Sequence, residues 1–190
     1  MTRQKHPSRA SALLSRELCL RLPQLTRGAI RGHVGARFKS GVRVWKKDAV
    51  VTIGSGALVG QGVRIAVFGN PHQPAELQVG AHTSIGDRSI INVQRCVTIG
   101  ERCDISWDVQ ILDSDFHTIA ELDGSLKDDT AAVAIADHVW IGTGVIILKG
   151  VSIGKDSVIG AGAVVSTNIP DGVLVAGNPA RVIRKVDGWR

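Results

Sequence analysis

An aliphatic residue occupies every sixth position between residues 135 and 165. The series consists of Ile135, Ile141, Ile147, Ile153, Ile159 and Val165. A period of six matches neither the 3.6-residue repeat of an amphipathic helix nor the two-residue alternation of a single strand. It is typical of hexapeptide repeats, in which each hexad supplies one short strand and one corner of a parallel β-helix. The pattern therefore predicts an all-β coil whose aliphatic side chains point inward and stack about 4.8 Å apart.

The same period extends upstream in three further phases. These are Ile53, Val59 and Ile65, then Val79, Ile85 and Ile91, then Ile99, Ile105 and Ile111. The phase breaks near 67–78 and 113–134, where Gly, Pro, Asn, Asp and Ser gather, and such residues predict loops. Because long loops that leave a rigid scaffold often carry function, both breaks are candidate positions for a site.

Charge is distributed unevenly along the chain. Residues 1–47 hold twelve Lys or Arg and one acidic residue, whereas residues 48–190 hold eleven basic and sixteen acidic residues. We therefore predict a basic N-terminal segment at 1–40, a hexapeptide-repeat β-helix at 41–170 and a tail at 171–190. Within the basic segment, leucines at helical spacing predict a short amphipathic helix: Leu14, Leu18, Leu22 and Leu25. It either caps the open end of the coil or lets residues 1–47 contact an anionic membrane surface.

The remaining features favour a cytoplasmic location, either free or peripheral at the inner face of the membrane. The three cysteines, Cys19, Cys96 and Cys103, form no CxxC or metal-ligand spacing, and a reducing compartment is the simplest interpretation. No apolar run reaches the ~20 residues that a membrane span needs. Nucleic acid is not an expected partner, because no aromatic platform or known binding motif accompanies the basic residues.

His117 is the main candidate for chemistry. It follows Asp113 and Asp115 in the sequence Asp-Ser-Asp-Phe-His, within the second predicted loop. A neutral imidazole is suited to act as a general base near neutral pH, and a nearby carboxylate such as that of Asp115 can fix its tautomer. The alternative is a solvated loop histidine. A zinc site is not expected, because no second histidine stands near His117 at a ligand spacing.

The C-terminal block carries a second group of candidates. It reads VWIGTGVIILKGVSIGKDSVIGAGAVV and continues as IPDGVLVAGNPARVIRK. Small residues at the corners allow an extended ligand to lie flat along a coil edge. Basic side chains in the tail, Arg181, Arg184 and Lys185, are suited to phosphate groups; the alternative is a basic, solvated tail.

These motifs resemble those of the hexapeptide-repeat acetyltransferases, in particular the group of maltose and galactoside O-acetyltransferases. The resemblance covers about residues 79–186 and is tightest over 138–185. It implies a left-handed parallel β-helix, a homotrimer with active sites between subunits, and acetyl-CoA as the donor without an acyl-enzyme. It also implies an acceptor hydroxyl on a sugar or glycoconjugate, in surface polysaccharide synthesis.

The resemblance further implies residue roles. His117 matches the catalytic base, Asn92 the residue that holds the acceptor hydroxyl, and the Thr143 N–H a donor to the developing oxyanion. Contacts with CoA are implied for Trp140, Thr143, Ala161, Ser166, Thr167, Arg181 and Arg184.

Other functions remain open from the sequence. Transfer to an antibiotic or to the amine of a nucleotide amino sugar is the nearest enzymatic alternative. A zinc hydratase of the same fold and a non-enzymatic trimeric scaffold are more distant ones. No metal is expected for the leading interpretation.

Overall fold

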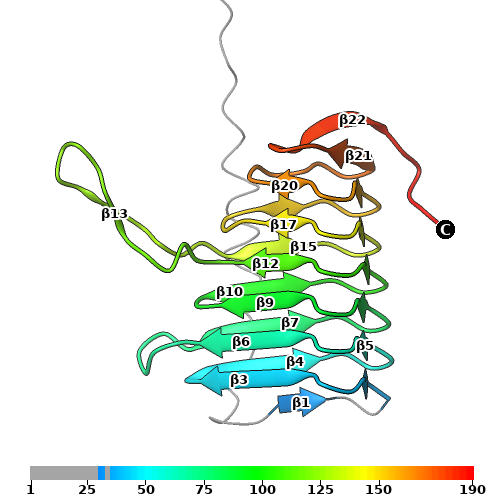
Figure 1. The fold of residues 1–190 in the computed structure, drawn as a ribbon, viewed down its shortest axis with the longest axis horizontal. Helices are drawn as coiled ribbons and strands as arrows, with labels where there is room; N and C mark the ends of the chain where they lie inside the picture. The colour runs from blue at the N-terminus through cyan, green and yellow to red at the C-terminus, as the bar shows by residue number, and fades with distance from the viewer. Residues whose placement is uncertain (1–29, 33–34) are drawn as a thin grey trace, which may run out of the picture.

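The protein is a parallel β-helix in the shape of a three-sided prism (Figure 1). The computed structural model describes residues 30–32 and 35–190. Each turn of the chain contributes one strand to each of three sheets, called sheets A, B and C, and nothing in the described part of the chain is helical. No helix able to cross a membrane therefore occurs in that part.

The strands of each sheet follow in spatial order. Sheet A contains β1 (Ile30–Gly32), β4 (Ala49–Ile53), β7 (Ala75–Val79), β10 (Cys96–Ile99), β15 (Val133–Ile135) and β18 (Ser152–Ile153). Sheet B contains β2 (Arg37–Phe38), β5 (Leu58–Val59), β8 (Ser84–Ile85), β11 (Asp104–Ile105), β16 (Trp140–Ile141), β19 (Val158–Ile159), β21 (Val173–Ala176) and β22 (Arg181–Lys185). Sheet C contains β3 (Arg43–Lys47), β6 (Arg64–Phe68), β9 (Ile90–Val93), β12 (Gln110–Leu112), β17 (Ile146–Ile147) and β20 (Val164–Val165).

The core is the stack of inward aliphatic side chains that the hexads predicted. In sheet B, Ile105 lies beside Ile141, which lies beside Ile159, and all three are at most 1% exposed. Sheet C repeats the arrangement with Ile111 beside Ile147. The prediction of a hexapeptide coil is confirmed, because each aliphatic position of one coil packs on the same position of the next.

Glycine after the aliphatic residue allows the coils to approach closely at the corners. A Cβ added at Gly54 would lie 2.5 Å from the backbone nitrogen of Ala81 in the next coil, a distance that real Cβ atoms do not adopt. The turns also need a left-handed residue, which His138 provides at one corner with φ 57°. Short polar residues and glycine tolerate that region best, which explains the composition of the corners.

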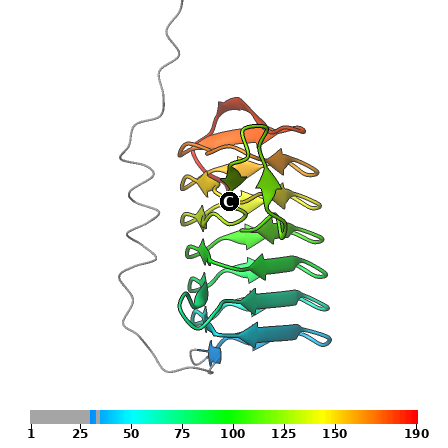
Figure 2. The ribbon, with the colours of Figure 1, turned by 90° about the vertical axis from the view of Figure 1, so that its left-hand side faces the viewer.

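Two excursions leave the prism at the corner between sheets C and A. The first is the tight loop 69–74, closed by hydrogen bonds between the backbones of Asn70 and Gln73. The second, 113–132, carries an antiparallel hairpin of β13 (Ile119–Ala120) and β14 (Leu126–Lys127). Figure 2 looks onto this corner, and Figure 1 shows the hairpin standing away from the stacked coils. Both loops fall within the breaks at 67–78 and 113–134, and are shorter because the flanking strands β6, β7 and β15 extend into them.

The coiled region extends past the boundaries predicted at 41 and 170. At the N-terminal end β1 and β2 already pair with β4 and β5. At the other end β21 still belongs to sheet B, and β22 folds back antiparallel on it. Inward positions near the N-terminal end, such as Val42 and Val44, are only partly buried, so the hexad signal weakens there. The predicted amphipathic helix at 14–25 lies outside the described residues.

Truncation of the inner ladder tests its contribution to stability. Ile141 is fully buried between Ile105 and Ile159, so Ile141→Ala should lower the free energy of unfolding by about 2–5 kcal/mol. Ile183→Ala, at a position 60% exposed on β22, is the matched control and should change it by no more than about 0.5 kcal/mol. Chemical denaturation of both variants provides the comparison, and similar losses would contradict the stacked-core account.

Candidate functional site

The base of the second excursion is held by a buried carboxylate. Asp113 is fully buried and accepts backbone N–H groups from Gln94, Arg95 and Cys96 at 2.7–2.8 Å. Burial raises the pKa of the Asp113 carboxyl, and these N–H donors oppose the shift. Asp113 therefore ties the start of the loop to the coil below it and does not orient His117.

The residues between Asp113 and His117 are fixed by further contacts. The Ser114 hydroxyl accepts the N–H of Phe116 at 2.8 Å and donates to Gln94 Oε1 at 3.0 Å. Phe116 adopts a left-handed φ of 60°. These contacts turn the chain so that His117 follows as an exposed residue at the start of the hairpin.

Asp115 has a different partner from the one predicted. Its Oδ2 lies 2.7 Å from Lys149 Nζ, and Lys149 Nζ also donates to the backbone oxygen of Asp128. Lys149 thus joins the two ends of the excursion. Within the described part of the chain, no hydrogen bond or ion pair reaches the His117 ring, so the proposed orienting role of Asp115 is not seen in this chain.

Asn92 lies on the same side of the prism as the excursion. In sheet C, Asn92 is the register partner of Leu112, and its backbone oxygen accepts the N–H of Asp113 at 3.4 Å. Ser166 and Thr167 follow β20 at the corner between sheets C and A, several coils above. The structure therefore gathers Asn92, His117, Ser166 and Thr167 along one edge, called the C/A edge.

Other predicted residues lie along the edge between sheets B and C, called the B/C edge. There Thr143 Oγ1 and the Gly144 N–H both donate to the backbone oxygen of Trp107. The Gly162 N–H donates to the Thr143 oxygen at 2.8 Å, so Ala161 stacks one coil above Thr143. Among the described residues, the N–H groups of Thr143 and Ala161 have no hydrogen-bond partner. Both donors are exposed and available to a ligand that lies along this edge.

Trp140 stands on the outer face of sheet B beside the end of the chain. Its ring centre is 6.3 Å from that of Trp189. Trp189 stacks on His138 at 4.8 Å and 13° and donates its Nε1–H to the His138 oxygen at 2.8 Å. His138 Nδ1 in turn lies 2.8 Å from Asp156 Oδ1. Sequence reasoning missed Trp189, because a tryptophan that directly follows Gly188, after the last hexad, belongs to no periodic pattern.

Arg181 and Arg184 lie on β22, whose side chains are all exposed. Among residues 30–32 and 35–190, each guanidinium contacts only a neighbouring backbone oxygen, Arg181 Nη1 that of Ala180 at 2.8 Å and Arg184 Nη1 that of Lys185 at 3.4 Å. The guanidinium groups therefore remain available to an anion at the C-terminal end of the prism.

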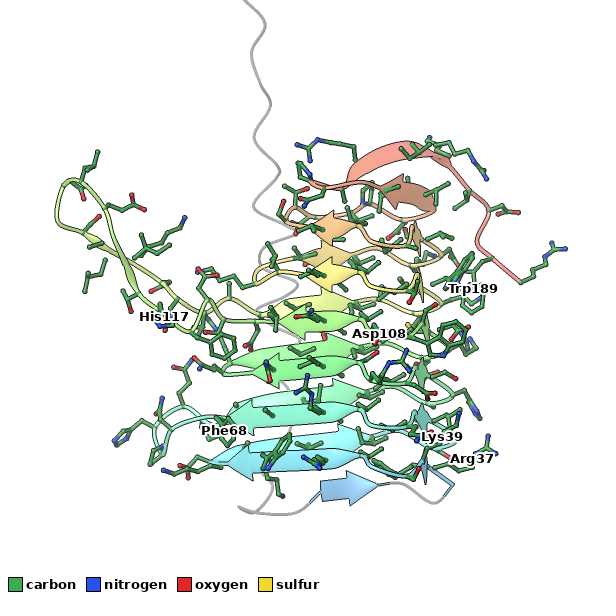
Figure 3. The ribbon with its side chains drawn as sticks, viewed as in Figure 1. Arg37, Lys39, Phe68, Asp108, His117 and Trp189 are labelled. Atoms are coloured by element: carbon green, nitrogen blue, oxygen red, sulfur yellow. The ribbon has the colours of Figure 1, made fainter. Side chains whose placement is uncertain are left out.

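An open groove of about 380 Å³ runs beside Arg64 and Arg88 on sheet C, and a larger one of about 620 Å³ runs along sheet B. The larger groove reaches from Lys39 past Ser84 and Asp104 to the indoles of Trp107, Trp140 and Trp189. Figure 3 shows Lys39 and Trp189 on this side of the prism and His117 on the opposite side. A single chain therefore does not bring His117 and Trp140 together.

The described residues contain no group of three His, Cys, Asp or Glu side chains arranged to hold a metal ion. The geometry thus offers exposed backbone donors, an imidazole and terminal cations, which together suit an extended phosphorylated ligand.

Comparison with known proteins agrees with the fold. Residues 133–167 match the family model "Bacterial transferase hexapeptide (six repeats)". The galactoside O-acetyltransferase of Escherichia coli K12 is 33% identical over 141 residues, which is 74% of this chain and 66% of that enzyme. The putative acetyltransferase YJL218W of Saccharomyces cerevisiae is 61% identical over 54 residues, 28% of each chain. The alignments thus span less than two thirds of each of these relatives.

Among solved structures, the polySia-specific acetyltransferase NeuO superposes with a TM-score of 0.61 at 25% identity, covering 85% of this chain and 88% of NeuO. The prism is thus a left-handed parallel β-helix, as predicted. The chain thus carries the hexapeptide repeat of bacterial transferases and is similar in sequence and fold to hexapeptide-repeat acetyltransferases, among them a galactoside O-acetyltransferase.

The buried carboxylate at the loop base provides a test of how the site is held. In Asp113→Asn an amide NH₂ replaces one oxygen and faces a backbone N–H donor. At least one hydrogen bond is lost, and a buried donor is left unsatisfied, which should cost about 1–3 kcal/mol. Asp128→Asn, in the exposed part of the same excursion, is the control and should leave the melting temperature unchanged. Equal melting temperatures for both variants would contradict the proposed role of Asp113.

Proposed function

We propose that this protein transfers an acetyl group from acetyl-CoA to a hydroxyl of a sugar or glycoconjugate. The observation that carries the proposal is the division of the predicted site between two edges. The imidazole lies on the C/A edge, and the unpaired N–H groups of Thr143 and Ala161 lie on the B/C edge. Similarity to hexapeptide-repeat acetyltransferases supports the chemistry that joins them.

A homotrimer would unite the two edges. If three copies pack side by side with parallel axes, the C/A edge of one copy faces the B/C edge of its neighbour. His117 and Trp107 belong to the same coil, and Trp140 lies in the next coil above. The imidazole of one copy and the corner N–H groups of the next then stand at similar heights along the axis. A partner of the same sequence is thus the first partner that the geometry supports.

The proposed reaction is a direct transfer. The neutral imidazole of His117 accepts the proton of the acceptor hydroxyl while the hydroxyl oxygen attacks the thioester carbonyl carbon. The carbonyl oxygen gains negative charge, which the Thr143 N–H would stabilise. The C–S bond then breaks, the carbonyl re-forms, and the imidazolium returns its proton to the departing CoA thiolate. The products are an acetyl ester and free CoA, and no covalent enzyme intermediate is needed.

The cofactor would extend upward from this point. Its pantetheine arm would follow Ala161, Ser166 and Thr167 along the corners of two neighbouring copies. Its phosphates would reach Arg181 and Arg184 on β22, whose guanidinium groups are exposed. Arginine is suited to this role because its planar fork can bind phosphate in a bidentate manner.

The cellular location of the enzyme and the class of its acceptor complete the proposed function. We propose a cytoplasmic enzyme of surface polysaccharide synthesis, whose basic residues 1–47 contact the membrane surface. A transfer assay with acetyl-CoA and a panel of sugars, nucleotide amino sugars and antibiotics, read by thiol release, identifies the acceptor class. If no sugar in the panel increases the rate of thiol release, the proposed acceptor class is wrong.

Removal of the imidazole tests the proposed base. His117→Ala should lower kcat by about two to four orders of magnitude while the Kd for CoA stays within about twofold of the wild type. His82→Ala, which removes another exposed histidine at a coil corner, should leave kcat unchanged. Turnover at the wild-type rate in the His117 variant would exclude His117 as the base.

Removal of a tail guanidinium tests the proposed phosphate contact. Arg184→Ala should raise the Kd for CoA about tenfold, the loss expected for one charge-assisted hydrogen bond of about 1.5 kcal/mol, and should affect dephospho-CoA less. Calorimetric titration of both ligands makes the comparison. Equal losses for the two ligands would contradict a contact with the 3′-phosphate.

A further inference from the structure

We propose that the groove along sheet B binds a neutral oligosaccharide, several sugar rings long, parallel to the axis of the prism. This inference deepens the proposed function and depends on it, because it assigns a subsite and a chain length to the acceptor. Four features support it: the length of the groove, its aromatic wall, its balanced charge and its height relative to His117.

The groove is long in one direction. It runs across five consecutive strands of sheet B, from Lys39 after β2, through Leu58 and Ser84, to Asp104 and Trp140. Four steps of about 4.8 Å between neighbouring strands give a length of about 19 Å. A single hexopyranose ring cannot fill this length, whereas a linear oligosaccharide can.

Three indoles form the wall at the upper end of the groove. Trp107 is 58% exposed and Trp140 41% exposed, so their apolar faces are available to a ligand. Aromatic faces pack well against the C–H faces of sugar rings, because both surfaces are apolar and flat. The alternation of C–H faces with hydroxyl edges in an oligosaccharide matches a wall of indoles beside a polar floor.

Trp189 is held rigidly in this wall. Its Nε1–H donates to the His138 oxygen at 2.8 Å, and its ring stacks on that of His138 at 4.8 Å. Asp156 holds His138 in turn, with Oδ1 2.8 Å from Nδ1. The tail of the chain is therefore docked in place before any ligand binds, which reduces the entropy lost on binding.

The floor of the groove is polar and balanced in charge. The Asp87 carboxylate lies 3.8 Å from Lys39 Nζ and accepts the Gln61 N–H at 2.8 Å. Asp104 is exposed on the outer face of β11, where its carboxylate can accept hydroxyl protons. Two acids (Asp87 and Asp104) and two bases (Lys39 and Arg190) line the groove. A neutral glycan is favoured over a polyanion, because no excess of positive charge attracts one.

The groove also ends at the height where transfer would occur. Trp107 and His117 belong to the same coil, and the predicted cofactor contacts at Thr143, Ala161 and Arg184 lie above it. The groove begins at Trp140, which is also a predicted contact of CoA, and runs downward, away from the contacts above it. In a trimer, a donor arriving from the C-terminal end and an acceptor lying in the groove would therefore meet beside the imidazole.

Binding without acetyl-CoA tests this inference separately from catalysis. The probes are neutral hexasaccharides of α-glucan, β-glucan, galactan and mannan type, their monosaccharides, and polysialic acid. Tryptophan fluorescence and ligand-observed NMR report binding to the full-length protein. At least one hexasaccharide should bind at least tenfold more tightly than its monosaccharide and than polysialic acid.

Variants locate the binding surface. Trp189→Ala and Asp104→Asn should each weaken hexasaccharide binding at least fivefold, and Trp189→Phe should restore most of the loss. Trp45→Ala, which removes an exposed tryptophan on sheet C, away from the groove, is the control and should change the affinity less than twofold. His117→Ala should bind the hexasaccharide as the wild type does, even though transfer is lost.

Several results would overturn the inference. They are the absence of binding by every neutral hexasaccharide, equal affinity for a hexasaccharide and its monosaccharide, tighter binding of polysialic acid, or equal losses for the Trp45 and Trp189 variants. If Trp189→Ala instead weakens CoA at least fivefold and leaves the hexasaccharide unaffected, the groove belongs to the donor. Failure of the proposed function would give a different result: the hexasaccharide would bind, but no acetyl group would be transferred to it.

Discussion

The stacking of aliphatic side chains inside the prism is the interaction on which the rest of the structure depends. Each coil alone exposes its inner face, and only the next coil buries it, as Ile141 does for Ile105. Hydrogen bonds between parallel strands then set the spacing, so every residue has a defined height along the axis. This rigid spacing aligns residues separated by tens of positions, such as Trp107 with Thr143.

The corners hold the candidate site because the core has no room for polar groups that could react. Inward positions are almost entirely aliphatic, and the few buried polar side chains serve the backbone. Asp113 is the main example, since it satisfies three N–H groups at the base of the excursion. These three hydrogen bonds offset the free-energy cost of burying the carboxylate. They also fix the path of the chain that leads to His117. The N–H groups of Thr143 and Ala161 differ from these three, because they are exposed and have no hydrogen-bond partner among the described residues. A ligand could therefore accept hydrogen bonds from them.

Much of the fold could be predicted because burial leaves a periodic trace. The hexads from Ile135 to Val165 placed the inner ladder correctly, and the phase breaks located both loops. The partner of Asp115 could not be predicted, because Asp115 lies in a break between repeats and Lys149 lies a coil away, at a corner position that the hexad pattern does not restrict. The stacking of Trp189 on His138 could not be predicted from the sequence either, because it depends on the path of the chain after β22.

The sequence by itself determined that the chain forms a coil of short parallel strands, because only an aliphatic residue at every sixth position can line so narrow an interior. It also identified the residues that face outward in the motifs of a known family. Only the tertiary structure decided how these residues are distributed among the edges of the prism. His117 and Trp189 fall on opposite sides of the prism, and Trp140 lies beside Trp189. The corner that follows each strand is set by the winding of the coil, which sequence spacing does not encode.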